Sequence, residues 1–403
     1  MIRFDVFQSA PHRMMFFAGA LQTLLGIAWW VVDLGARYAG LYAPLSLPLP
    51  AVWVHATLMI FGVFSFFIFG FLMTALPKWV AMGALKPSDY VPPYVLLVAG
   101  WLAFYAALLW LPSLMPLAML LVALGWLLGW RPLWQAVHGS MNDNRQHAWA
   151  VLVANGFGIT GLLTMAAGLA LVEARLVGAA IEIGLWGFLA PTFFIVTHRM
   201  LPFFSGSVIR GYDEYRAIWP LWAMLGAFAL HAVLAILGLR TWSWGVDLPA
   251  AGLMFWLAFR WQLWKSLASH LLAMHHLAGL WLATAFALYG VQSLLSMAGV
   301  AWGGRMPLHA LTIGYFGSLV LGMATRVTLG HSGRLISSDV WSWRLFWLLQ
   351  PVVLLRLTGE FVELSGPANL IWLSGLGWIA VFGQWSRVHL LMFVRPRPDG
   401  RPG

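Results

Sequence analysis

Two histidines frame one long apolar segment of this sequence. His309 lies near its start and His331 at its end, and between Met306 and Gly330 the one charged residue is Arg326. Imidazole is a common axial ligand of haem iron and a good ligand for copper. In a straight helix, a rise of about 1.5 Å per residue separates the two rings by about 33 Å. They therefore cannot share a metal, and the sequence predicts two sites, or one site and one structural histidine.

The segment that carries them has the length of a membrane span, which needs about 20 apolar residues. The whole chain agrees with this interpretation, because 61% of its 403 residues are hydrophobic and 9% are charged. It contains no cysteine, which excludes disulfides, iron–sulfur clusters and thiolate metal sites. The basic residues are scattered over short loops, so the net charge of +10 does not indicate a nucleic-acid partner.

Hydropathy, proline and glycine divide the chain into about twelve predicted transmembrane helices. We expect an all-α polytopic membrane protein with a single transmembrane helical domain over 1–394 and a disordered cytoplasmic tail over 395–403. The predicted spans are 14–35, 52–77, 91–111, 114–133, 147–172, 176–200, 217–239, 247–265, 270–297, 306–330, 342–363 and 367–392.

The distribution of basic residues predicts the orientation of these spans. With twelve spans, 18 of the 23 lysines and arginines fall on the side that holds both termini, and 5 fall on the other side. Cytoplasmic loops carry the excess of positive charge in membrane proteins. We therefore expect both termini in the cytoplasm.

This orientation sorts the histidines by depth. The outer layer holds His55, His231 and His309, and the inner layer holds His198, His270, His275, His276 and His331. We expect the remaining four to lie in loops or at the interface, exposed to solvent; these are His12, His138, His147 and His389.

Polar side chains inside a membrane are costly and usually serve a function. His55 and His309 lie at similar depth on different helices, where they could hold a haem between them. Alternatively, each forms a hydrogen bond to a neighbouring helix. Small residues such as Gly314, Gly317 and Gly322 would let the helix approach a flat macrocycle, although they equally favour plain helix packing.

In the inner layer we pair His276 with His331. Arg199, Arg326 and Arg334 lie at this depth, where guanidinium groups suit haem propionates, quinone oxygens or an anionic substrate. The alternative is that each arginine is an ordinary anchor of the cytoplasmic side.

Several motifs resemble the NnrS family, bacterial inner-membrane proteins with about twelve helices that are reported to carry haem and copper and are associated with the response to nitric oxide. The strongest motif is HALTIGYFGSLVLGMATRVTLGHSGR, residues 309–334. Further motifs are the run from His55 to Trp79, RMLPFFS at 199–205, and the segment 276–281.

The resemblance implies that His55, His276, His309 and His331 bind metal, and that Arg199, Arg326 and Arg334 belong to the cofactor sites. One motif departs from the family pattern. Family members usually read H-x-H-E-M where this chain reads His55-Ala-Thr-Leu-Met59, so the second histidine and the glutamate are missing. This implies one cofactor fewer, or one that is bound differently.

We therefore expect a multi-pass haem protein of the bacterial inner membrane that acts in nitric oxide tolerance or metabolism. It would bind or reduce nitric oxide, or another small diatomic ligand, at haem b, with copper or a second haem as further cofactor. Besides lipids, its expected partner is a quinol or another electron donor. One alternative is a haem-based electron carrier or quinol-linked oxidoreductase without nitric oxide chemistry. Another is an anion or metal transporter, which should show internal repeats that the sequence lacks.

Overall fold

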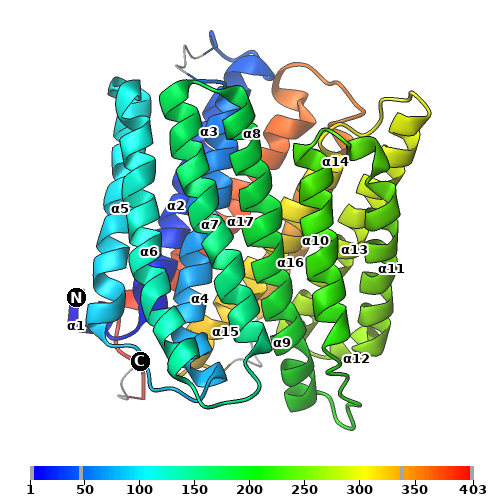
Figure 1. Cartoon of the computed structure of the whole chain (residues 1–403). Helices are drawn as coiled ribbons and strands as arrows, with labels where there is room; N and C mark the ends of the chain where they lie inside the picture. Colours follow the sequence, from blue (N-terminus) through cyan, green and yellow to red (C-terminus); the bar gives the residue numbers. More distant parts are fainter. Residues whose placement is uncertain (1–3, 45–48, 336–339, 400–403) are drawn as a thin grey trace.

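The protein is a bundle of roughly parallel helices (Figure 1). The computed structural model describes residues 4–44, 49–335 and 340–399. Within these ranges all regular structure is helical and no strand occurs, which confirms the predicted all-α class.

The long helices fall into the order that hydropathy predicts, and several are built from consecutive segments. The helical segments, with π- and 3₁₀-segments labelled η, are α1 (Phe4–Phe7), α2 (Pro11–Arg37), α3 (Ala51–Thr57), η1 (Leu58–Val63), α4 (Phe64–Trp79), α5 (Pro87–Trp110), η2 (Pro112–Leu114), α6 (Met115–Gly139), α7 (Gln146–Leu171), α8 (Ala174–Glu182), η3 (Ile183–Leu189), α9 (Ala190–Val208), α10 (Trp219–Ile236), η4 (Arg240–Trp242), α11 (Trp244–Arg260), α12 (Leu263–Ser266), α13 (His270–Met297), α14 (Met306–His309), η5 (Ala310–Gly317), α15 (Ser318–His331), α16 (Val340–Thr358), η6 (Gly366–Ala368) and α17 (Leu370–Val394).

Each of the twelve predicted spans overlaps a helix of the described chain. Nine helical segments within the described residues are long and apolar enough to cross a membrane. The protein is therefore a multi-pass membrane protein. The count of twelve spans and their orientation stay predictions.

The bundle has two ends, which we call upper and lower as they appear in Figure 1. The upper end carries α3, α8 and α14, and the lower end carries α1, α12 and the end of α9. At the lower end the Arg13 guanidinium donates hydrogen bonds to the backbone carbonyls of Met392, Phe393 and Arg395 at 3.1–3.2 Å. The two ends of the described chain are therefore joined at the lower end, which corresponds to the predicted cytoplasmic side.

The segment after α17 also contacts the bundle. Residues 400–403 of the predicted disordered tail lie outside the described residues. In the part that is described, Arg397 donates a hydrogen bond to the carbonyl of His331 at 3.3 Å. Its hydrogen bond to Asp399 raises the pKa of Arg397, so the guanidinium stays charged. The polar composition of this segment did not predict the contact.

Three of the long helices contain a π-helical segment near the upper end: η1, η3 and η5. Such segments are rare and occur often at functional sites, because the wider turn changes the direction of the side chains. His55 lies three residues before η1, and His309 directly precedes η5.

The glycines of α15 and η5 pack against side chains of neighbouring helices. An added Cβ would lie 2.7 Å from Trp281 at Gly314, 3.0 Å from Trp378 at Gly317, and 3.3 Å from His275 at Gly322. Plain helix packing therefore accounts for these small residues.

Candidate cofactor site

A large cavity lies at the lower end of the bundle. Its volume is about 910 Å³, and its wall is built mainly by α4, α7, α9 and α15. Among the described residues, the carboxylate of Asp143 lines it together with seven basic or imidazole side chains: Lys78, His147, His198, Arg199, Arg216, Arg326 and His331. A pocket of this size accommodates a large organic cofactor.

Two of the imidazoles form a direct pair. His147 Nε2 lies 3.0 Å from His198 Nδ1, so one ring donates a hydrogen bond and the other accepts it. Both side chains are buried, and His147 Nδ1 has no hydrogen-bond partner within the described residues. The predicted solvent exposure of His147 is therefore wrong, because the start of α7 packs against α9 instead of ending in solvent.

His331 is held in one tautomer by its own helix. Its Nδ1 lies 3.1 Å from the carbonyl oxygen of Val327, and a carbonyl can only accept, so Nδ1 carries the proton. In the neutral ring this leaves the Nε2 lone pair free, which is the arrangement found in histidines that ligate metals.

The neighbour of His331 is His12, not His276. The ring centroids of His12 and His331 lie 4.6 Å apart. His12 is buried, with its Nδ1 3.4 Å from the Thr74 hydroxyl, so its predicted solvent exposure is also wrong. His276 instead pairs its Nε2 with the hydroxyl of Ser205 at 3.0 Å. The structure thus places the predicted partners His276 and His331 in different surroundings.

The three arginines of the motifs do not share one site. Arg199 stacks over Trp79 at 4.9 Å and Arg326 over Phe204 at 3.8 Å, and both line the cavity. Among the described residues, neither forms an ion pair. Arg334 does not line the cavity and lies within electrostatic range of Arg13. Two unpaired guanidinium groups in one wall suit an anionic ligand.

At the upper end, the structure brings His55 and His309 within electrostatic range of each other and of Arg356. The His55 ring stacks on Trp30 at 4.2 Å, and its Nδ1 is buried without a hydrogen-bond partner in the described chain. His309 Nδ1 donates to the carbonyl of Arg305 at 2.9 Å, which again leaves Nε2 free.

His231 belongs to a separate buried pair. Its Nδ1 lies 2.7 Å from Asp247 Oδ1, and the Asp247 side chain is fully buried. The rings of Trp186 and Tyr289 enclose His231 at 4.0 and 4.8 Å. The sequence placed His231 in the outer half but did not indicate Asp247.

Sequence reasoning missed His12 and Lys78 as well as the position of His147. One signal was present for His12, because Pro11 is favoured in the first turn of a helix and therefore predicts that α2 begins before His12. His138 is exposed as predicted, whereas His389 is buried. No comparable signal indicates which helix ends converge on the cavity.

Across the described residues, no group of three or more His, Cys, Asp or Glu side chains has the arrangement of a metal site. A haem differs from a bare metal ion, since the protein need supply only one or two axial ligands.

Comparison with known families gives one result that spans nearly the whole chain. The family model described as NnrS protein matches residues 6–397. A comparison with curated proteins finds no match. The family match confirms the resemblance that the motifs predicted.

Proposed function

The chain belongs to the NnrS family, and on that premise we propose that it is a membrane haem protein of the response to nitric oxide whose haem lies in the lower cavity. We place it in the bacterial inner membrane. The observation that supports this most directly is that imidazole and unpaired guanidinium groups line the same cavity.

The donor set fits a haem. His331 of α15 and the hydrogen-bonded pair of His147 and His198, from α7 and α9, line the cavity from different helices, and we propose that they would hold the haem. The Nε2 lone pair of His331 is available because Nδ1 is bound to Val327. The bond between His147 and His198 would fix the orientation of both rings, as hydrogen-bond partners of ligating histidines commonly do.

The basic side chains fit the propionates of a haem. Arg199, Arg326 and Lys78 line the cavity, and the two arginines are held by aromatic rings rather than by carboxylates. Their charges are therefore available to an anionic ligand. Such contacts fix the orientation of the cofactor and influence its reduction potential.

When bound, a haem would supply an iron atom that can bind nitric oxide. The chain's own part would be to hold the ring through its histidines and to neutralise the propionates through Arg199, Arg326 and Lys78. Reduction of nitric oxide would further need an electron donor, for which we propose a quinol.

A second cofactor position at the upper end is supported by His55 and His309. Within the part of the chain that the structure describes, both rings carry a nitrogen without a hydrogen-bond partner, and the two rings lie within electrostatic range of each other. We propose a second haem or copper there. Two six-coordinate haems, one at each end, would favour the alternative of an electron carrier without nitric oxide chemistry.

The test is the absorbance spectrum of the purified protein in three states: oxidised, reduced, and reduced with nitric oxide. We expect a Soret band that shifts when nitric oxide is added to the reduced protein. A Soret band that does not move would favour the electron carrier. Absence of haem after expression with adequate haem supply would contradict the proposal and favour transport of an anion.

A further inference from the structure

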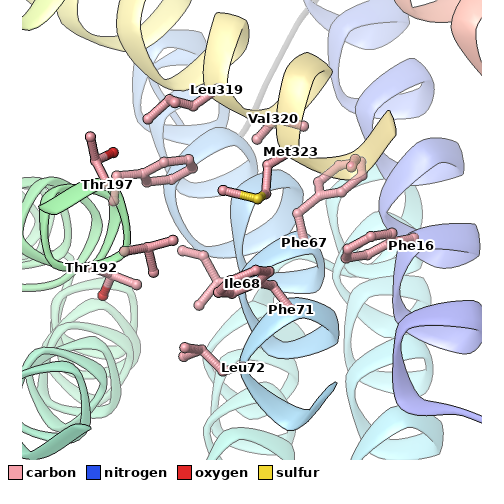
Figure 2. Close-up of a pocket in the computed structure, with 13 residues that line it drawn as sticks. Phe16, Phe67, Ile68, Phe71, Leu72, Thr192, Thr197, Leu319, Val320 and Met323 are labelled. Atoms are coloured by element: carbon pink, nitrogen blue, oxygen red, sulfur yellow. The ribbon is translucent and has the colours of Figure 1, made fainter. Parts of the chain in front are cut away.

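A second, smaller cavity lies beside the lower cavity, inside the bundle (Figure 2). Its volume is about 50 Å³, and its wall comes from α2, α4, α9 and α15. Figure 2 shows Val320 and Met323 of α15 opposite Ile68 of α4, with Thr192 and Thr197 of α9 at one side. Nearly all the lining atoms are apolar.

The polar atoms in this wall are too few to hold water. The hydroxyls of Thr197 and Tyr315 lie 3.1 Å apart and satisfy each other. Of the described residues that line the cavity, Thr192 offers the one hydroxyl without a partner. A buried water needs about two to four polar partners, whereas apolar cavities stay dry and bind xenon or small apolar molecules.

The small cavity adjoins the proposed haem site. On three helices, residues that line one cavity lie at or within two positions of residues that line the other. On α9 Thr197 is followed by His198, and on α15 Ala324 is followed two positions later by Arg326. On α4, Phe71 lines both cavities. An apolar ligand in the small cavity would therefore be separated from the lower cavity by about one layer of side chains.

We propose that this cavity is a binding site for an apolar diatomic gas, which it holds next to the lower cavity. Its volume suits a ligand of two heavy atoms, since it is about a third of an engineered cavity of about 150 Å³ that binds benzene. Gases of this class dissolve in the hydrocarbon core of a bilayer, so the site can fill from the membrane. The identity of the gas as nitric oxide rests on the proposed function; the binding site itself does not.

Xenon is the probe, because it binds apolar cavities without needing haem. Met323 lines the cavity and reports occupancy through the NMR signal of a ¹³C-labelled methyl group, assigned by Met323→Leu. We expect a saturable shift of this signal as xenon pressure rises. Met141, which is 95% exposed, serves as internal reference and should show only a linear solvent effect.

Val320→Phe fills the cavity and should weaken xenon binding at least ~10-fold, because the added ring occupies the ligand's space. The matched control is Val153→Phe on the exposed face of α7, which should leave the Met323 response unchanged. Should Val320→Phe fail to fold, Leu319→Ala enlarges the cavity instead and should strengthen the saturable response.

A Met323 signal that does not respond in the wild type, or a response that survives Val320→Phe, would overturn the proposal. Saturable xenon binding in a protein that contains no haem would leave the gas site intact and would contradict only the proposed function. The two ideas therefore fail in distinguishable ways.

Discussion

At the scale of single residues, the protonation of the histidines matters as much as their position. His331 and His309 each donate Nδ1–H to the carbonyl four residues earlier, which leaves Nε2 as the free acceptor. The sequence predicted both residues as metal ligands, but it could not predict the tautomer, because that depends on the rotamer of each ring. The contact of His12 with His331 was also not predictable, because the two residues are 319 positions apart in the sequence.

The arginines allow a direct comparison of motif and geometry. Arg326 lines the lower cavity and Arg334 does not, although the sequence predicted both at the cofactor. Arg326→Gln should lower haem affinity about 10-fold, because one charge-assisted contact to a propionate is lost. Arg334→Gln should leave it unchanged. Haem transfer to apomyoglobin measures both, and equal effects would contradict the assignment of the arginines to the lower cavity.

The His231–Asp247 pair gives a prediction about stability. Asp247→Leu leaves the buried His231 Nδ1 without its acceptor and should cost about 1–3 kcal/mol of stability. Asp247→Asn keeps an acceptor oxygen and should cost less. Thermal unfolding in detergent ranks the stabilities of the two variants and the wild type. Glu363→Leu, which replaces an exposed acid, is the control. Equal stability of the leucine variant and the wild type would show that the pair does not stabilise the fold.

At the scale of helices, the pattern of apolar residues bounded by proline and glycine was sufficient to predict where the long helices lie. Two features were not predictable from it. The π-segments η1, η3 and η5 depend on contacts between helices, and no local residue pattern marks them. The pairing of His12 with His331 and of His147 with His198 depends on which helices are neighbours in space. Hydropathy predicts the depth of a residue in the membrane, but not the direction in which its side chain points around the helix axis.

Close packing between helices predicts opposite effects for two glycines of α7. An added Cβ at Gly158 would lie 2.0 Å from the ring of Trp126, which is fully buried and cannot move aside. Gly158→Ala should therefore destabilise the protein by about 1–3 kcal/mol. An added Cβ at Gly156 would meet no atom within 4 Å, so Gly156→Ala should be neutral or slightly stabilising. A thermal shift of the same sign and size in both variants would contradict the packing of α6 against α7.

At the scale of the whole molecule, composition, span length and charge asymmetry predicted the class of the protein and the ranges of its helices. They also placed His198, His331, Arg199 and Arg326 at one depth, which is where the lower cavity lies. The cavity itself was not predictable, because it depends on how far apart four helix ends are held. The predicted orientation of the bundle rests on the charge distribution alone and is open to a direct test.

The absence of native cysteine allows single cysteines to report the orientation. Met141 lies in the loop between α6 and α7, and Glu363 lies between α16 and α17; both are exposed. In intact cells, a membrane-impermeant maleimide should label Glu363→Cys but not Met141→Cys. Both should react after lysis. The reverse pattern would contradict the cytoplasmic placement of the lower end.

The central claim is that the lower cavity holds a haem through His331. The most direct measurement is the haem content per protein of His331→Ala, compared with His138→Ala as a matched exposed histidine and His309→Ala at the upper end. We expect His331→Ala to lose most of the haem that responds to nitric oxide, while His138→Ala keeps it. Full retention of that haem in His331→Ala, together with its loss in His309→Ala, would contradict the account and move the nitric oxide site to the upper end.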